Sequence, residues 1–185
     1  MLERLKKCLA VAPVVRVGNY DYFVNPITDG VPRMDPMVLA ETLEAIKEVG
    51  DFHCDVIVAP EAMGIPLVVP LALELGIPYT VVRKRRYGLP GELEITQWTG
   101  YSHREMYIND IRLGDRVVLV DDVMSTGGTI RAIVHGLREI GAEIVDVIVV
   151  VEKGSKKMEI EKDLGIRIKT LVKVMVREGK LVVLS

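Results

Sequence analysis

Residues 117–129 read Val117-Val118-Leu119-Val120-Asp121-Asp122-Val123-Met124-Ser125-Thr126-Gly127-Gly128-Thr129, and this segment is the clearest indication of the fold class. Four apolar residues with high strand propensity lead into two adjacent carboxylates. A small loop of hydroxyl residues and glycines follows, and the pattern predicts a helix from Ile130 onward. The expected local structure is therefore a buried strand that ends at the acid pair, a turn and a helix.

The acid pair and the loop after it have the composition of a ligand site. Two like charges at the edge of a sheet repel each other, and this costs stability unless a ligand or cation uses them. The loop from Ser125 to Thr129 offers backbone N–H groups, three hydroxyls and a helix N-terminus, which together form a phosphate cradle. The pattern indicates a phosphorylated sugar as ligand. The alternative is an ordinary strand-turn-helix junction with incidental acids.

The bulk composition fits one globular domain without nucleic acid or membrane as a partner. The chain has 185 residues, 49% of them hydrophobic, and a net charge of −2. This charge favours neither nucleic acid nor an anionic membrane. The longest apolar run, Ile65 to Leu73, contains two prolines and is too short to span a bilayer.

The N-terminus and the cysteines predict a cytoplasmic protein. The first ten residues lack a long apolar core and a convincing cleavage site, so we expect no signal peptide. Cys8 and Cys54 are far apart and have no metal-type spacing. Both are expected to remain reduced thiols.

Strand and helix patterns alternate along the chain, which predicts an α/β fold with a central parallel sheet covered on both faces. The regions 14–33 and 85–106 are expected to be irregular. The C-terminal segments are expected to pair as a hairpin across Glu178-Gly179. Helices are predicted over 2–10, 36–49, 65–75, 130–140 and 156–164, and strands over 55–59, 78–84, 116–120, 144–151, 166–176 and 181–184.

Polar or glycine-containing segments follow four of the predicted parallel strands. Because ligands bind beyond the carboxyl ends of such strands, these segments should share one rim of the sheet. They are residues 59–64, Arg83-Lys84, Asp121-Asp122 and Glu152-Lys153.

The segment Val118 to Thr129 resembles the signature of the type I phosphoribosyltransferases, which bind phosphoribosyl pyrophosphate (PRPP). The resemblance implies a type I phosphoribosyltransferase fold with a single domain over residues 1–185. The core would span about 36–155. A small hood for base recognition would come from about 1–35 and 156–185, and a mobile loop at about 85–106 would close over the reacting sugar. The resemblance also implies a homodimer.

The resemblance assigns PRPP and Mg²⁺ to particular residues. Asp121 and Asp122 would act in catalysis by binding the ribose hydroxyls and would hold Mg²⁺ directly or through water. The pyrophosphate would bind at Met63 and Gly64, where the family often carries an arginine, and at Arg83 and Lys84. Arg83 and Lys84 begin a run of four cations, Arg83-Lys84-Arg85-Arg86, and the alternative is that this run is an ordinary solvated surface. The 5′-phosphate would bind at Ser125, Thr126, Gly127, Gly128 and Thr129.

The resemblance also bears on the base. A lysine at the position of Lys153 donates to O6 in the members that use 6-oxopurines, and Asn25 resembles an asparagine that reaches the base in xanthine-type members. Tyr101-Ser102 resembles a pair in the hoods of xanthine- and hypoxanthine-type members. Ser125 departs from the pattern, because many hypoxanthine-guanine members carry an aspartate there.

The expected activity is therefore purine salvage. The chain would transfer the phosphoribosyl group of PRPP to hypoxanthine or guanine, giving IMP or GMP and pyrophosphate. Transfer to adenine or xanthine is the first alternative. A regulatory protein that senses PRPP or purines is the second, although the short stretch before residue 20 cannot house a helix-turn-helix domain.

Overall fold

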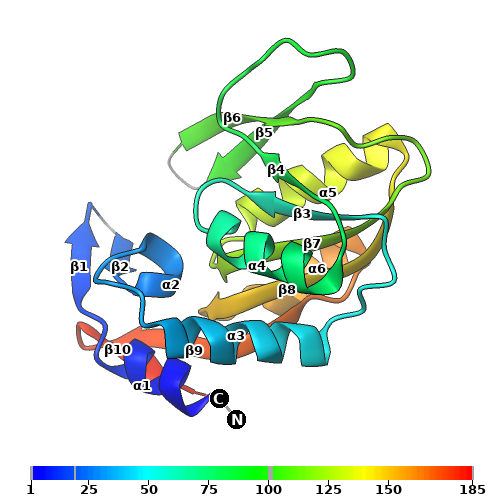
Figure 1. Ribbon diagram of the computed structural model, residues 1–185. Helices are drawn as coiled ribbons and strands as arrows, with labels where there is room; N and C mark the ends of the chain where they lie inside the picture. The colour runs from blue at the N-terminus through cyan, green and yellow to red at the C-terminus, as the bar shows by residue number, and fades with distance from the viewer. Residues whose placement is uncertain (1, 19, 100–101, 185) are drawn as a thin grey trace.

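A six-stranded sheet forms the centre of the computed structural model, which describes residues 2–18, 20–99 and 102–184 (Figure 1). The strand order is β10-β9-β8-β7-β3-β4. Neighbouring strands are parallel except for β10, which runs antiparallel to β9 at one edge. The strands are β3 (Val56–Pro60), β4 (Tyr79–Val82), β7 (Arg116–Met124), β8 (Glu143–Lys153), β9 (Lys169–Arg177) and β10 (Lys180–Val183).

Helices cover both faces of this sheet, as the continuous apolar strands predicted. Alternate residues of β7 point to opposite faces, so Val118 and Val120 join one hydrophobic core while Val117 and Leu119 join the other. The first core packs against α1 (Glu3–Ala10), α3 (Pro36–Val49) and α4 (Ile65–Leu75). The second packs against α5 (Gly128–Ile140) and α6 (Lys157–Leu164).

The strand that carries the acid pair is longer than predicted. β7 continues beyond Asp122 because Val123 and Met124 still pair with Val151 and Glu152 of β8. The two carboxylates therefore lie within the sheet instead of at its exposed edge, and both are buried.

The region 14–33 is regular, contrary to prediction. It forms β1 (Val14–Val17), β2 (Tyr20–Phe23) and the short helix α2 (Pro26–Asp29). These elements lie together at one end of the molecule, at the left of Figure 1. We call β1, β2 and α2 the hood, because they fall within the N-terminal segment 1–35 for which a hood was predicted.

The C-terminal segment does not join the hood, so that part of the prediction is wrong. Residues 156–185 supply α6, β9 and β10, and the last two are strands of the central sheet. β9 is parallel to β8, and its buried residues Val172 and Val174 belong to the first core. The predicted hairpin between the two C-terminal strands is confirmed.

The polar region 85–106 contains a β-hairpin where no regular structure was predicted. β5 (Leu93–Thr99) pairs antiparallel with β6 (Ser102–Ile108), and this hairpin lies above α5 in Figure 1. Gly136 of α5 permits the close contact, because a Cβ there would lie 2.6 Å from Ile95 and 2.8 Å from Ile108. Tyr101 lies outside the described residues.

Helix length and composition also bear on membrane insertion. Within the described ranges, every helix is too short or too polar to cross a bilayer.

Candidate active site

The loop Ser125–Thr129 joins β7 to α5, and we call it the phosphate loop. Gly127 has a φ of 78°, a left-handed conformation that side chains disfavour. A Cβ at Gly127 would also lie 2.3 Å from Cδ1 of Ile160. Glycine is therefore required both by the backbone and by the contact with α6. α5 begins at Gly128, so its unpaired N–H groups open toward this loop.

The side chain of Arg131 holds the phosphate loop against α6. Nη1 of Arg131 donates to the carbonyl oxygen of Thr126 at 2.8 Å, and Nη2 donates to Asp163 of α6 at 2.6 Å. Glu159 lies 3.8 Å from the same guanidinium. The charge of Arg131 is thus balanced by carboxylates of α6, while its geometry fixes the loop.

The acid pair is buried and electrostatically strained. Asp121 and Asp122 are 4% and 8% exposed, and the Asp122 N–H donates to Oδ1 of Asp121 at 2.9 Å. Burial raises the pKa of both carboxyls, and the neighbouring Asp121 charge raises the pKa of Asp122 further. The positive charge of the Lys84 ammonium lowers the pKa of Asp121 and so opposes the effect of burial. Because β3, β4 and β7 are parallel, the segment after β4 that carries Lys84 and the acid pair of β7 lie toward the same edge of the sheet.

This donor set fits Mg²⁺ only when a substrate completes it. Among the described residues, no group of three or more His, Cys, Asp or Glu side chains is arranged to hold a metal ion. Mg²⁺ commonly binds through one or two carboxylates together with substrate phosphates and water. Asp121 and Asp122 can supply the protein part of such a site.

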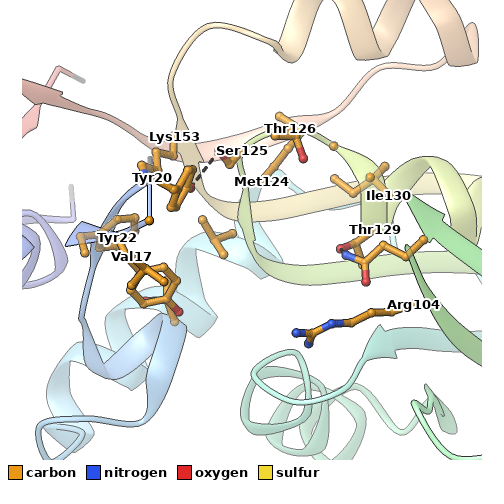
Figure 2. Close-up of a pocket in the computed structure, with 17 residues that line it drawn as sticks. Val17, Tyr20, Tyr22, Arg104, Met124, Ser125, Thr126, Thr129, Ile130 and Lys153 are labelled. Carbon is orange, nitrogen blue, oxygen red and sulfur yellow. Dashed lines mark hydrogen bonds between the residues drawn. The ribbon is translucent and has the colours of Figure 1, made fainter. Parts of the chain in front are cut away.

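A cavity of about 970 Å³ opens between the hood, the hairpin and the phosphate loop (Figure 2). We call it the main cavity. It brings together the predicted phosphate residues and Lys153, which lie far apart in the chain. Its lining consists of Val17, Gly18, Tyr20, Tyr22, Phe23, Thr28, Gln97, Arg104, Val123, Met124, Ser125, Thr126, Gly127, Gly128, Thr129, Ile130 and Lys153.

Lys153 reaches from the end of β8 to the hood. Its Nζ donates to the carbonyl oxygen of Asp21 and lies 3.6 Å from the ring centroid of Tyr20. The Tyr20 hydroxyl in turn donates to Oγ of Ser125 at 3.1 Å. Tyr20 therefore connects the predicted base-binding lysine to the phosphate loop, as Figure 2 shows. This role of Tyr20 was not foreseen.

The structure does not bring Asn25 to the main cavity, contrary to prediction. Asn25 is fully buried and serves as the N-cap of α2, where its Oδ1 accepts from the Ile27 N–H at 3.0 Å. Its Nδ2 donates to Sγ of Cys8 at 3.3 Å. Both ends of the side chain are engaged in fixing the hood.

Tyr22, unlike Asn25, is a polar hood residue that lines the cavity. Its hydroxyl donates to Asp29 at 2.5 Å, and Asp29 also accepts from Thr28 at 2.6 Å. Burial raises the pKa of Tyr22, and the bond to Asp29 adds to this. α2 of the hood contacts β7, the strand of the acid pair, and the Asp29 charge adds to the raised pKa of Asp122.

The predicted pyrophosphate residues form a second group beside the main cavity. Glu61 holds the two segments together, because its carboxylate lies 3.1 Å from both Nε of Arg83 and the Lys84 N–H. A Cβ at Gly64 would lie 2.8 Å from the Pro60 carbonyl. Met63 points toward the hood, with its Cε 3.7 Å from the position of a Cβ on Gly30.

The hairpin contributes two residues that were not predicted. Gln97 donates from Nε2 to Oγ1 of Thr129 at 2.6 Å, and Arg104 is its partner across the strands. The signal was present in the alternation of Leu93 and Ile95 with polar residues, which is typical of a strand with one buried face.

The fold and the site together define a phosphoribosyltransferase, and the chain belongs to the family of the phosphoribosyl transferase domain, whose sequence pattern matches residues 37–174. Curated relatives extend over nearly the full length. The hypoxanthine/guanine phosphoribosyltransferase of Methanobacterium lacus is 52% identical, with 97% of this chain and 95% of the relative aligned. The protein of that name from Methanocaldococcus jannaschii is 50% identical, with 98% of each chain aligned.

Solved structures of proteins named adenine phosphoribosyltransferase have the same fold. The adenine phosphoribosyltransferase of Thermoanaerobacter pseudethanolicus superimposes with a TM-score of 0.76 at 27% identity, covering 94% of this chain and 99% of that one. The type I fold predicted from the sequence is therefore confirmed.

Proposed function

We propose that this chain transfers the phosphoribosyl group of PRPP to hypoxanthine or guanine, with release of pyrophosphate and formation of IMP or GMP. The observation that carries the proposal is the main cavity, which joins the phosphate loop to Lys153 at the carboxyl ends of β7 and β8. The full-length similarity to relatives named hypoxanthine/guanine phosphoribosyltransferase supports the same substrates.

The phosphate loop and the acid pair would hold the ribose 5-phosphate part of PRPP. Backbone N–H groups at the start of α5 favour the 5′-phosphate, and the carboxylates of Asp121 and Asp122 would accept hydrogen bonds from the ribose hydroxyls. Because both acids are buried, ribose hydroxyls and nearby cations would favour their ionised forms.

The reaction would exchange one bond at C1′ for another. The C1′–O bond to pyrophosphate breaks and its electron pair leaves with the pyrophosphate. A purine nitrogen then supplies the electron pair for the new C1′–N bond, and the purine loses one proton. The ionised acid pair would favour the positive charge that develops on the sugar. Lys84 would hold the departing pyrophosphate. Mg²⁺ carried by PRPP would offset the charge of that leaving group.

Lys153 supports a 6-oxopurine over adenine. An ammonium only donates hydrogen bonds, so it suits O6 of hypoxanthine or guanine and meets the amino group of adenine as one donor facing another. Lys153 already donates to the Asp21 carbonyl, which leaves further protons for a base. The hood side chains Tyr20, Tyr22 and Phe23 provide aromatic surface beside it.

Adenine is the second candidate, because the fold matches adenine phosphoribosyltransferases. A competition assay distinguishes the two. Purified enzyme with PRPP and Mg²⁺ is given equal concentrations of hypoxanthine and adenine, and nucleotides are separated by chromatography. Predominant IMP supports the proposal, and predominant AMP refutes it. Tight PRPP binding without product from any purine would favour the regulatory alternative.

We also expect a homodimer in the cytoplasm, as the resemblance to the family implied. Sedimentation equilibrium on the purified protein measures the first expectation. A monomer at the concentration used for the activity assay would contradict it.

A further inference from the structure

Arg104 lies where the hairpin meets the phosphate loop. It is a lining residue of the main cavity, and its partner across the strands, Gln97, is bonded to Thr129. Figure 2 shows the guanidinium extending into the cavity beside Thr129. The hairpin is held at this place by the contact of Ile95 and Ile108 with Gly136, so the position of Arg104 is set by packing.

Two other cations near the phosphate loop are already engaged. Arg131 lies on the α6 side of the loop, and its guanidinium contacts the Thr126 carbonyl, Asp163 and Glu159. Lys153 contacts the Asp21 carbonyl and the Tyr20 ring. Met63 occupies the position at which the family often carries an arginine, so that position adds no charge.

A bound 5′-phosphate carries up to two negative charges, whereas a helix N-terminus supplies the equivalent of only about half a positive charge. In the complex with PRPP the buried acids Asp121 and Asp122, which immediately precede Val123 of the cavity lining, would add negative potential in their ionised forms. A cation on the open side of the phosphate loop would therefore make a substantial contribution to phosphate binding. Arginine suits this task because its planar guanidinium can donate two parallel hydrogen bonds to a phosphate.

We propose that Arg104 binds the 5′-phosphate of PRPP and so closes the phosphate site from the side of the hairpin. The inference rests on the proposed function and deepens it. The 5′-phosphate is favoured over the pyrophosphate because Arg104 shares the cavity with all five residues of the phosphate loop. Met63, Gly64 and Lys84 are not lining residues of that cavity. Phosphate binding would then also hold the hairpin in place.

Ligands that carry only one of the two groups test the inference. IMP carries the 5′-phosphate without pyrophosphate, and inosine carries neither. Calorimetry should show that Arg104→Gln weakens IMP binding by about 10- to 100-fold, the usual effect of losing a charged hydrogen bond. Inosine and pyrophosphate should bind as they do to the unaltered enzyme. Arg104→Lys should recover part of the lost IMP affinity.

Arg112→Gln is the matched control. Arg112 is an exposed arginine that lies 3.6 Å from Asp110 at the surface, and its loss should leave IMP binding unchanged. Undiminished IMP affinity in Arg104→Gln would overturn the inference, and a selective loss of pyrophosphate affinity would do so as well. Failure of the unaltered enzyme to bind IMP and PRPP would instead refute the proposed function.

Discussion

Arg131 supports Thr126 from the side of the phosphate loop that faces α6, with 2.8 Å between its Nη1 and the Thr126 carbonyl oxygen. Arg131→Gln removes this bond and the ion pair with Asp163. The loop should then sample conformations in which its N–H groups no longer converge. We expect the KM for PRPP to rise about tenfold, as for the loss of one charged hydrogen bond, with little change in the KM for hypoxanthine.

Arg138→Gln is the control for this prediction, because Arg138 lies two turns further along α5. It donates to the Leu164 carbonyl of α6 at 2.7 Å and is not a lining residue of the main cavity. The variant loses a similar contact between the same two helices. An equal rise in the KM for PRPP in both variants would show that helix packing, rather than support of the loop, is responsible.

Gly127→Ala should displace the phosphate loop for two reasons. The new Cβ would lie 2.3 Å from Ile160, and the alanine would have to adopt a left-handed backbone conformation. Gly165 also has a positive φ, of 61°, but has open space around it. Gly165→Ala should therefore lose only about 1–2 kcal/mol of stability. Urea denaturation and PRPP binding, measured on both variants, separate the clash from the backbone strain. Equal losses of PRPP affinity would contradict the prediction.

Asp122→Asn should stabilise the free enzyme at neutral pH. Burial raises the pKa of the acid pair, so the folded state favours protonated carboxyls. The protonated acid pair therefore contributes stability to the folded state. This contribution is fully present below the ordinary carboxyl pKa of about 4 and is lost as the pH rises through the pKa values of the folded protein. The difference in unfolding free energy between variant and unaltered enzyme should grow from pH 4 to pH 7. Each kcal/mol corresponds to about 2–4 °C in Tm.

The same substitution should lower turnover. Asparagine keeps the shape of Asp122 but removes the charge that favours the developing positive sugar, and the loss of such an electrostatic contribution commonly costs about 100-fold in kcat. Steady-state assays with saturating PRPP and hypoxanthine measure it. A variant that is more stable and fully active would remove Asp122 from the mechanism.

Lys153→Ala should narrow the preference for hypoxanthine over adenine. The variant loses a hydrogen-bond donor to O6 of hypoxanthine and also loses the donor that opposes the amino group of adenine. Together these changes should reduce the ratio of the kcat/KM values for hypoxanthine and adenine by roughly one to two decades, which corresponds to about 1–3 kcal/mol. Lys156→Ala is the control, since Lys156 is an exposed lysine that pairs with Glu159. An unchanged ratio in Lys153→Ala would assign base selection to the hood.

Much of the core was predictable because its strands are continuous apolar runs with glycines after the helices. The turn between β7 and α5 was predictable from local sequence, because hydroxyl residues and two glycines directly follow an apolar run. The hood and hairpin were not predicted as regular structure. Their short strands depend on contacts with distant residues, such as Ile95 with Gly136, and these contacts cannot be inferred from local pattern.

The misplacement of Asn25 has a related cause. The residue type suits hydrogen bonding to a base and suits a helix N-cap equally well, and the choice depends on how α2 enters the hood. Asp122 illustrates the same limit, because its burial follows from the pairing of Val123 with Val151 rather than from its own identity.

The cavity residues proposed to bind the base and those proposed to bind the sugar phosphate come from different parts of the chain, and this separation bears on how new base specificities arise. The sugar-phosphate elements come from the middle of the sequence, whereas Tyr20, Tyr22 and Phe23 of the cavity come from a short N-terminal unit. Under the proposed function, we expect substitutions in that unit to alter the base that is accepted without disturbing the transfer chemistry. On this proposal, changes confined to the hood would be enough to separate a chain similar in sequence to hypoxanthine/guanine enzymes from adenine enzymes of the same architecture.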